Sequence, residues 1–230
     1  MATTTRPITP PRAAAVAGIV FSALMGVSFV IIRIASTYYG SDPGKWLSDP
    51  VHRGAFLLAL QLIPFAGIAF LWFIGVLRSR LGELEDQFFA TVLFGSGLLF
   101  VACLFASAGV SAALVSAMAD GHIGLSNSDT YYFARQLMGV LLNVFAIKMA
   151  GVFTMSSSTI MLRTGILPRW VAFLGFASAA ILLLLITNWP WIVLLFPSWI
   201  LIVSTAILIA DLRSGQRKVV NATATHPAPG

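Results

Sequence analysis

In this 230-residue chain, the ionisable side chain of Lys148 lies deep inside an apolar stretch. The run from Leu137 to Leu162 is apolar enough to cross a bilayer, and an ionisable residue inside such a run marks a functional site by default. Placing a lysine at the centre of a membrane costs about 2.5–3.5 kcal/mol on insertion scales. No acidic residue lies in another apolar stretch to pair with it. The sequence therefore predicts that other groups offset this charge.

Three interpretations of Lys148 stay open at this point. In the first, its flexible stem carries the ammonium group to the head groups of the inner leaflet. In the second, it belongs to a polar site inside the bundle that binds an anionic lipid or solute. In the third, it pairs with a carboxylate of a different polypeptide. Within the chain, Pro64 deprives the Leu60 carbonyl of its helical hydrogen bond. The candidate partners are that carbonyl, Gln61, Asn143, Ser96 and the serines at 156–158.

The apolar stretches lack the combinations of residues that catalysis in a membrane requires. Phe94-Gly95-Ser96-Gly97 resembles the nucleophile motif of intramembrane serine proteases, but a serine nucleophile needs a base within reach, and no histidine lies in an apolar stretch. All eight acidic residues lie outside the apolar cores, which excludes two embedded carboxylates sharing a proton. No two histidines have the spacing of a metalloprotease motif. We expect a protein that is not an enzyme and holds no metal or cofactor.

The composition indicates a membrane protein, because 58% of the residues are hydrophobic and 10% are charged, against about 25% charged in soluble domains. A helix needs about 20 apolar residues to cross a bilayer. Six stretches meet or approach that length: Ala13–Ile32, Gly54–Leu77, Phe88–Ala108, Leu137–Thr159, Trp170–Thr187 and Trp191–Ala210. The predicted fold is an all-α polytopic bundle of six transmembrane helices over residues 13–211, with disordered tails at 1–12 and 212–230.

The basic residues are spread over the ends of these stretches rather than gathered in a patch. One set of flanks carries nine of them: Arg6, Arg12, Arg78, Arg80, Arg163, Arg169, Arg213, Arg217 and Lys218. The other set carries four: Arg33, Lys45, Arg53 and Arg135. Because cytoplasmic flanks carry the excess of Lys and Arg, we expect both termini in the cytoplasm and the protein in the inner (plasma) membrane. The expected partners are membrane lipids and other integral membrane proteins, and not nucleic acid.

Small residues recur at helical spacing in two of the stretches. In the first, Ala14, Gly18, Ser22 and Gly26 follow one another at every fourth position. In the third, whose apolar helical pattern continues to about Met118, Gly95, Ala102, Gly109 and Ser116 recur every seventh position. Small residues let two helices approach closely in a membrane. Both faces are therefore predicted to pack against neighbouring helices.

Two turns carry strong local signals. Asp49-Pro50 suits an N-cap followed by proline at the first helical position. Gly165 suits a helix C-cap, and Pro168 suits the first turn of the next helix. The turn Arg163-x-Gly165-x-Leu167-Pro168-Arg169-Trp170, followed by the small-residue stretch Val171–Ile186, resembles a signature of uncharacterised bacterial multi-pass membrane proteins, catalogued as domains of unknown function. The resemblance implies a six-helix bundle and supplies no catalytic residues.

Two classes of function are consistent with these patterns. The first is a non-catalytic accessory subunit of a larger inner-membrane assembly, related to transport or to envelope lipids. Short loops, the lack of embedded acids and the small-residue faces favour it. The alternative is a small standalone transporter or lipid-binding membrane protein with a polar site around Lys148. Its site would comprise Lys148, Gln61, Asn143 and the helix kink at Pro64.

Overall fold

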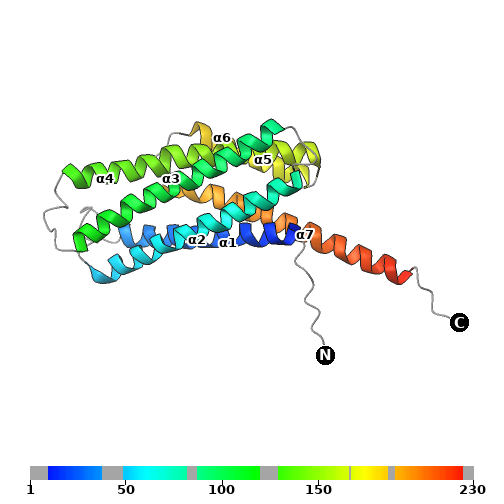
Figure 1. Ribbon diagram of the computed structural model, residues 1–230, viewed down its shortest axis with the longest axis horizontal. Coiled ribbons are helices and arrows are strands. Elements are labelled where there is room, and N and C mark those ends of the chain that lie inside the picture. Colours follow the sequence, from blue (N-terminus) through cyan, green and yellow to red (C-terminus); the bar gives the residue numbers. More distant parts are fainter. Residues whose placement is uncertain are drawn as a thin grey trace, which may run out of the picture.

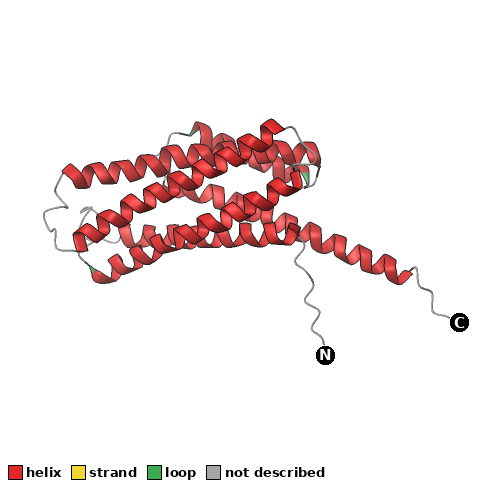
Figure 2. Cartoon of the chain, viewed as in Figure 1, coloured by secondary structure: helices red, strands yellow, loops and turns green. Residues whose placement is uncertain are grey.

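The computed structural model describes residues 10–37, 49–81, 87–119, 129–165, 167–185 and 190–224, and these form an all-helical bundle (Figures 1 and 2). This confirms the predicted all-α fold. The helices are α1 (Pro10–Thr37), α2 (Pro50–Leu81), α3 (Gln87–Ala119), α4 (Asp129–Val140), the π-helix η3 (Leu141–Ala146), α5 (Ile147–Thr164), α6 (Arg169–Leu184), the 3-10 helix η4 (Pro190–Leu194) and α7 (Leu195–Ala224). α4, η3 and α5 follow one another without a break. α7 continues as a helix to Ala224, into the stretch for which a tail from residue 212 was expected.

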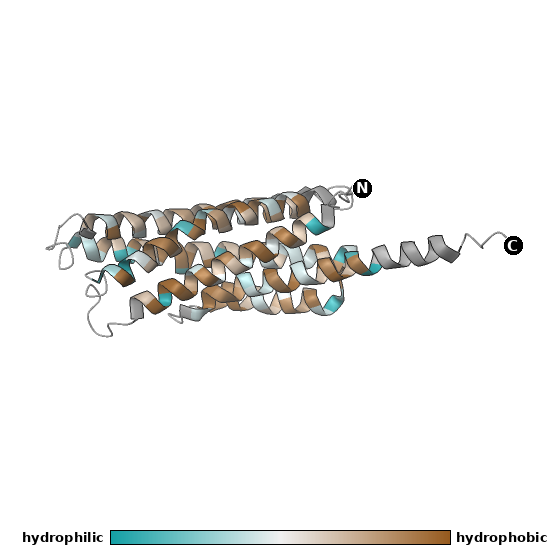
Figure 3. Ribbon diagram, turned by 90° about the horizontal axis from the view of Figure 1, so that it is seen from below, coloured by the Kyte–Doolittle hydropathy of each residue, from teal (hydrophilic) through white to brown (hydrophobic). Residues whose placement is uncertain are grey.

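Among the residues that the structure describes, five helical segments are long and apolar enough to cross a bilayer, as judged by their length and composition: Arg12–Ala35, Pro50–Leu77, Phe88–Ala117, Asp129–Thr164 and Trp191–Arg213. Hydrophobic residues predominate along them (Figure 3). The predicted span Trp170–Thr187 is different, because α6 has only 16 residues. At 1.5 Å per residue it is about 24 Å long, short of a hydrocarbon core of about 30 Å. Six full-length spans are therefore not seen.

The turn signals in the sequence correspond to real helix ends. The Val51 amide donates a hydrogen bond of 2.9 Å to Asp49 Oδ1 at the start of α2. Gly165 has a φ of 64° and ends α5, with its amide donating to the Met161 carbonyl. Pro168 is the N-cap residue of α6. These local interactions define where α2 and α6 begin and where α5 ends, and so they orient the chain between its long helices.

A cluster of five buried phenylalanines joins five of the helices. It consists of one residue each from α1, α2, α3, α5 and α7: Phe21, Phe70, Phe100, Phe153 and Phe196. Ring centroids lie 4.8 Å apart for Phe21 and Phe70, and 5.2 Å apart for Phe70 and Phe153. Aromatic pairs at such separations add about 0.5–1.5 kcal/mol each beyond their buried area. The cluster is the centre of the packed core.

Helix approach in this core depends on glycines, but not on all of those predicted. Gly18 lies against Ser204 of α7 and Phe73 of α2, and its neighbours Ala14 and Ser22 on the same face of α1 are buried. Gly97 of α3 lies against Ile74 and Phe153. A Cβ atom added at either glycine would collide with these neighbours. A larger residue at either position would therefore require these side chains to shift, between α1 and α7 or between α3 and its neighbours α2 and α5.

The seven-residue stripe of α3 lies largely outside the core of the described chain. Ala102 and Gly109 are exposed, and Gly95 is half-buried. A Cβ added at Gly95, at Gly109 or at Gly26 of α1 would have no atom of another part of the described chain within 4 Å. Within the described chain, α3 packs through the side that carries Gly97, and packing of the stripe against another helix stays a prediction. Both sides of α3 are apolar, so the spacing of small residues did not indicate which one is buried.

α6 and α7 extend only partway along the bundle (Figure 1). Arg12 Nε and Asp211 Oδ2 form an ion pair at 2.6 Å, which places this part of α7 beside the start of α1. We call this the Arg12 end, and the end at which α1 finishes the Arg33 end. The end of α6 lies inside the bundle, because it contacts Lys148 Nζ, near the middle of the 36-residue segment Asp129–Thr164. The segment that leads into α7 begins beside α1, since the Phe29 and Trp191 rings are 6.1 Å apart. The Arg33 end is therefore formed by α1, α2, α3 and α4.

Candidate ligand-binding cavity

A cavity of about 510 Å³ lies between the helices at the Arg33 end. Its walls come from α1, α2, α3, α4 and η3, and Val193 of η4 contributes to its lining. α6 ends beside Lys148, and η4, which leads into α7, reaches the wall of the cavity with Val193. The volume falls within the range of about 300–1,000 Å³ that is usual for small-molecule sites. The cavity therefore lies at the end of the bundle that α6 does not reach.

The lining is mostly apolar, and its charged members all have the same sign. The apolar side chains include Phe56, Leu60, Ile63, Leu104, Leu114, Val115 and Leu142. The charged members are Arg33 of α1 and Arg135 of α4, and none of the lining residues is acidic. The cavity therefore combines apolar walls with a positive charge.

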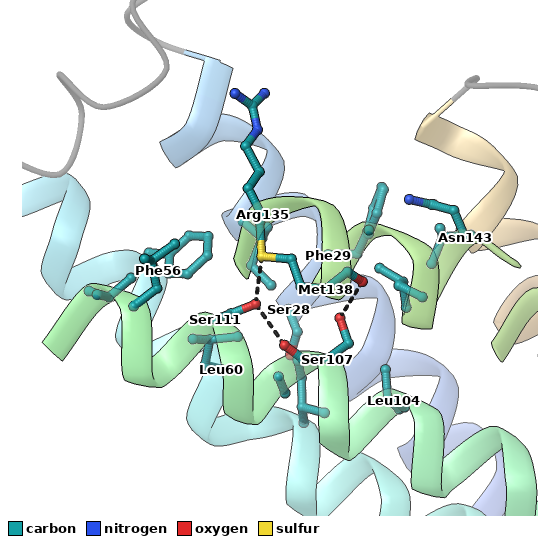
Figure 4. Close-up of a pocket in the computed structure, with 18 of the residues that line it drawn as sticks. Ser28, Phe29, Phe56, Leu60, Leu104, Ser107, Ser111, Arg135, Met138 and Asn143 are labelled. Atoms are coloured by element: carbon teal, nitrogen blue, oxygen red, sulfur yellow. Dashed lines mark hydrogen bonds between the residues drawn. The ribbon is translucent and has the colours of Figure 1, made fainter. Parts of the chain in front are cut away.

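Three serines and one methionine form a band of polar atoms across the cavity (Figure 4). Ser107 Oγ donates to the Met138 carbonyl at 2.9 Å, which joins α3 to α4. Ser111 Oγ lies 2.8 Å from the Ser107 carbonyl and 3.1 Å from Met138 Sδ. Ser28 of α1 is 1% exposed, and its hydroxyl has no hydrogen-bond partner among the described residues. Burying a hydroxyl without a partner costs about 1–3 kcal/mol in proteins, so Ser28 is available to a bound molecule.

The cavity is accessible beside α4. Gln136 and Asn143 both line it and are both exposed. α1 packs mainly on α2 and α7, whereas α4 packs on α3 and η3, so α1 and α4 face each other across the cavity. Arg135 is exposed, and Figure 4 shows its guanidinium directed away from the three serines. The cavity therefore has an apolar interior, a polar band and a cation near its exposed side.

The π-helix η3 lies in the wall of this cavity. The Ile147 amide that follows it donates to the Leu142 carbonyl, five residues earlier, in place of the usual four. Ser107 Oγ bonds the Met138 carbonyl just before this segment. π-turns inside α-helices are rare and occur frequently at functional sites. The sequence contained no signal for this one.

Lys148 does not line the cavity, and its hydrogen bonds go to the end of α6. Its Nζ atom lies 3.0 Å from the Leu182 carbonyl, 2.7 Å from that of Leu183 and 3.3 Å from that of Leu185. The last four carbonyls of a helix lack partners within it, and that end carries the negative pole of the helix dipole. Lys148 therefore caps a helix that ends inside the bundle. The need for a partner was evident from the sequence, whereas the identity of this partner was not.

The four residues predicted to share a site do not lie in one place. Asn143 lines the cavity, and Lys148 contacts α6. Gln61 and Pro64 are exposed on α2, and neither lines the cavity. Sequence reasoning missed the polar lining of the cavity: Ser28, Arg33, Ser107, Ser111 and Arg135. The available signals were two serines four positions apart in one apolar stretch and two arginines expected at the same side of the membrane.

Comparison of the chain with protein-family models, with curated proteins and with solved structures finds no match. The fold by itself defines a bundle whose long apolar helices are compatible with a membrane protein. Fold alone does not determine function, because one fold carries many different sites. The function is therefore argued from the cavity and its lining.

Proposed function

We propose that this protein is a non-catalytic integral membrane protein that binds a lipid-like molecule in the cavity at the Arg33 end. The observation that carries the proposal is a cavity of about 510 Å³ with apolar walls and a buried serine hydroxyl that lacks a partner. Ligand sites are mostly apolar with a few placed polar groups, and this cavity has that composition. An apolar molecule with one polar end fits it best.

The excess of basic residues at the Arg12 end supports an orientation with both termini in the cytoplasm. The membrane is then the inner (plasma) membrane, and the cavity lies towards its outer leaflet. Five helices cross the bilayer, while α6 enters from the cytoplasmic side and ends within it. A lipid of the outer leaflet would reach the exposed side of the cavity beside α4 directly.

Filling the cavity tests this proposal. Ala108 lines the cavity, whereas Ala102 lies on the same helix and is exposed outside it. We expect the wild type and the control variant Ala102→Trp, purified in mild detergent, to retain about one lipid-like molecule per chain in native mass spectrometry. Ala108→Trp is expected to lose that molecule while keeping its helical circular dichroism. Equal retention by Ala108→Trp and Ala102→Trp, or a wild type that neither carries nor takes up a lipid, would refute the proposal.

A second candidate function, an accessory subunit of a membrane assembly, is favoured by a different observation. One face of α3 consists of exposed small residues: Ala102, Ala106, Gly109 and Ala113. Such faces allow close approach of another helix in a membrane. Gly109→Leu should then remove co-purifying polypeptides, while Ala108→Trp should leave them in place. The two variants therefore separate the two functions.

A further inference from the structure

We infer that the ligand is a single-chain anionic phospholipid, a monoacylglycerol phosphate or a close relative, that enters from the bilayer between α1 and α4. This inference rests on the proposed function and specifies its ligand. The phosphate lies near Arg135 and Arg33, the glycerol portion lies at the serine band, and the acyl chain follows the apolar walls.

The charge of the ligand follows from the lining. Arg33 and Arg135 are its charged members, and no lining residue is acidic. Among the described residues, none forms an ion pair or a hydrogen bond with the side chain of Arg135. Guanidinium groups match phosphate and carboxylate oxygens with two parallel hydrogen bonds, which are stronger than bonds between neutral groups. An anionic head group is therefore favoured over a neutral one.

A second polar group in the ligand is indicated by the position of Ser28. Ser28 precedes Arg33 by five residues, about 7.5 Å along α1 at 1.5 Å per residue. Met138, which joins the serine band, follows Arg135 by three residues, about 4.5 Å along α4. A hydroxyl or ester carbonyl a few bonds below the phosphate would meet the unpartnered hydroxyl of Ser28. The glycerol of a monoacyl phospholipid supplies such a group, and a fatty acid does not.

The number of acyl chains and the route follow from size and exposure. About 510 Å³ lies in the middle of the range for sites that hold one small molecule, which favours one chain over two. The exposed lining residues Gln136 and Asn143 place the opening on the side of the bundle, beside α4 and η3. A molecule that is already dissolved in the membrane reaches this side without leaving the bilayer.

The test compares four probes that differ in one feature each, added to the full-length protein after delipidation in detergent. The probes are monooleoyl glycerol phosphate, oleic acid (an anion without glycerol), monoolein (glycerol without an anion) and monooleoyl phosphatidylcholine (a zwitterion). Binding is measured by native mass spectrometry and by the shift in Tm. We expect monooleoyl glycerol phosphate to bind at least about tenfold more tightly than monoolein, since a charge-assisted hydrogen bond is worth about that factor or more. It should bind about two- to tenfold more tightly than oleic acid, which lacks the neutral group that meets Ser28, and more tightly than the zwitterionic phosphatidylcholine, whose choline cancels the net charge.

Two pairs of variants assign this preference to residues. Arg135→Gln should reduce the preference for the phosphate over monoolein to less than about threefold, whereas Arg53→Gln should keep it. Arg53 is also near the Arg33 end but does not line the cavity. Ser28→Ala should weaken binding of the glycerol phosphate by about two- to tenfold without changing that of oleic acid. Ser204→Ala is its control, because Ser204 is also buried without a partner but lies against Gly18, outside the cavity.

Equal binding of the four probes, or an unchanged preference in Arg135→Gln, would overturn the inference. If Ala108→Trp abolishes binding of all four probes while the wild type shows no preference, lipid binding in the cavity holds and the assignment of the ligand fails. If the wild type binds none of the probes and Ala108→Trp retains the same co-purified lipid as Ala102→Trp, both fail. Any variant whose Tm in the absence of lipid falls by more than about 10 °C is replaced by Arg135→Met, which also removes the charge, or by Ser28→Cys, and the same criteria apply.

Discussion

The two ends of this bundle differ in the helices that build them and in the polarity of those helices. At the Arg12 end, α6 and α7 pack with the other helices, and close contacts at Gly18 and Gly97 bring helices together. At the Arg33 end, four helices surround a cavity of about 510 Å³. One difference is α6, which ends beside Lys148 and does not reach the Arg33 end. A cavity can thus lie where one helix of a bundle ends before its neighbours do.

Ending a helix inside an apolar environment leaves backbone carbonyls without partners, and in lipid each must find one. Lys148 donates hydrogen bonds to three such carbonyls at the end of α6. The cation that is isolated in the sequence and the helix that is too short to cross a bilayer therefore stabilise each other. The contact between Lys148 and α6 lies between the Arg12 end and the cavity at the Arg33 end.

Of the substitutions considered, replacing Lys148 should lower the free energy of unfolding most. Lys148→Met keeps an unbranched stem but removes the donor, which leaves the carbonyls of Leu182, Leu183 and Leu185 without their partner. Since each unpaired buried group costs about 1–3 kcal/mol and neighbouring groups relax in part, we expect a loss of about 3 kcal/mol in the free energy of unfolding. Titration with a denaturing detergent, followed by circular dichroism, measures it. Lys148→Arg keeps the donors and should lose less than half as much; a Met variant as stable as the wild type would show that α6 needs no cap.

The sequence predicted the helices and their turns well, because these depend on local chemistry. The N-cap at Asp49 and the C-cap at Gly165 are interactions between residues a few positions apart. The end of α6 was not predictable in this way. The run Trp170–Thr187 is uniformly apolar, with no glycine, proline or charge near Leu184 to mark where the helix stops. At this end the helix contacts Lys148, which lies 34 residues before Leu182 in the chain.

The cavity was hidden from sequence reasoning for a related reason. A serine in an apolar helix usually bonds its own backbone, as Ser22 does with the Gly18 carbonyl at 2.8 Å. Nothing local distinguishes Ser28 from Ser22, yet Ser28 lies at the cavity with a hydroxyl that lacks a partner among the described residues. Residues such as Gln61, which are conspicuous in the sequence, are exposed instead. The polar lining is a property of the tertiary arrangement.

A second prediction sharpens the contrast between glycines that face a neighbouring helix and those that do not. In Gly18→Leu, the new side chain would overlap Ser204 and Phe73, so α1 would move away from α7. Overpacking typically costs about 1–3 kcal/mol, and we expect a loss of about 2 kcal/mol. Gly109→Leu is the matched control, because its Cβ would meet nothing within 4 Å and the position is exposed. It should change the free energy of unfolding of the isolated chain by less than about 0.5 kcal/mol.

The smallest effect is expected at the ion pair that fastens α7 to α1. Arg12 and Asp211 are 2.6 Å apart, but their side chains are 35% and 16% exposed, so solvent screens their attraction. Exposed ion pairs contribute about 0.2–1 kcal/mol. A double-mutant cycle with Arg12→Gln and Asp211→Asn should therefore give a coupling free energy of about 0.5 kcal/mol, which falls as salt is raised. A coupling free energy above 2 kcal/mol would mean that the Arg12–Asp211 ion pair, and not the packing of phenylalanines and glycines, holds α7 at the Arg12 end. The difference between the Arg12 end and the Arg33 end would then depend on charge.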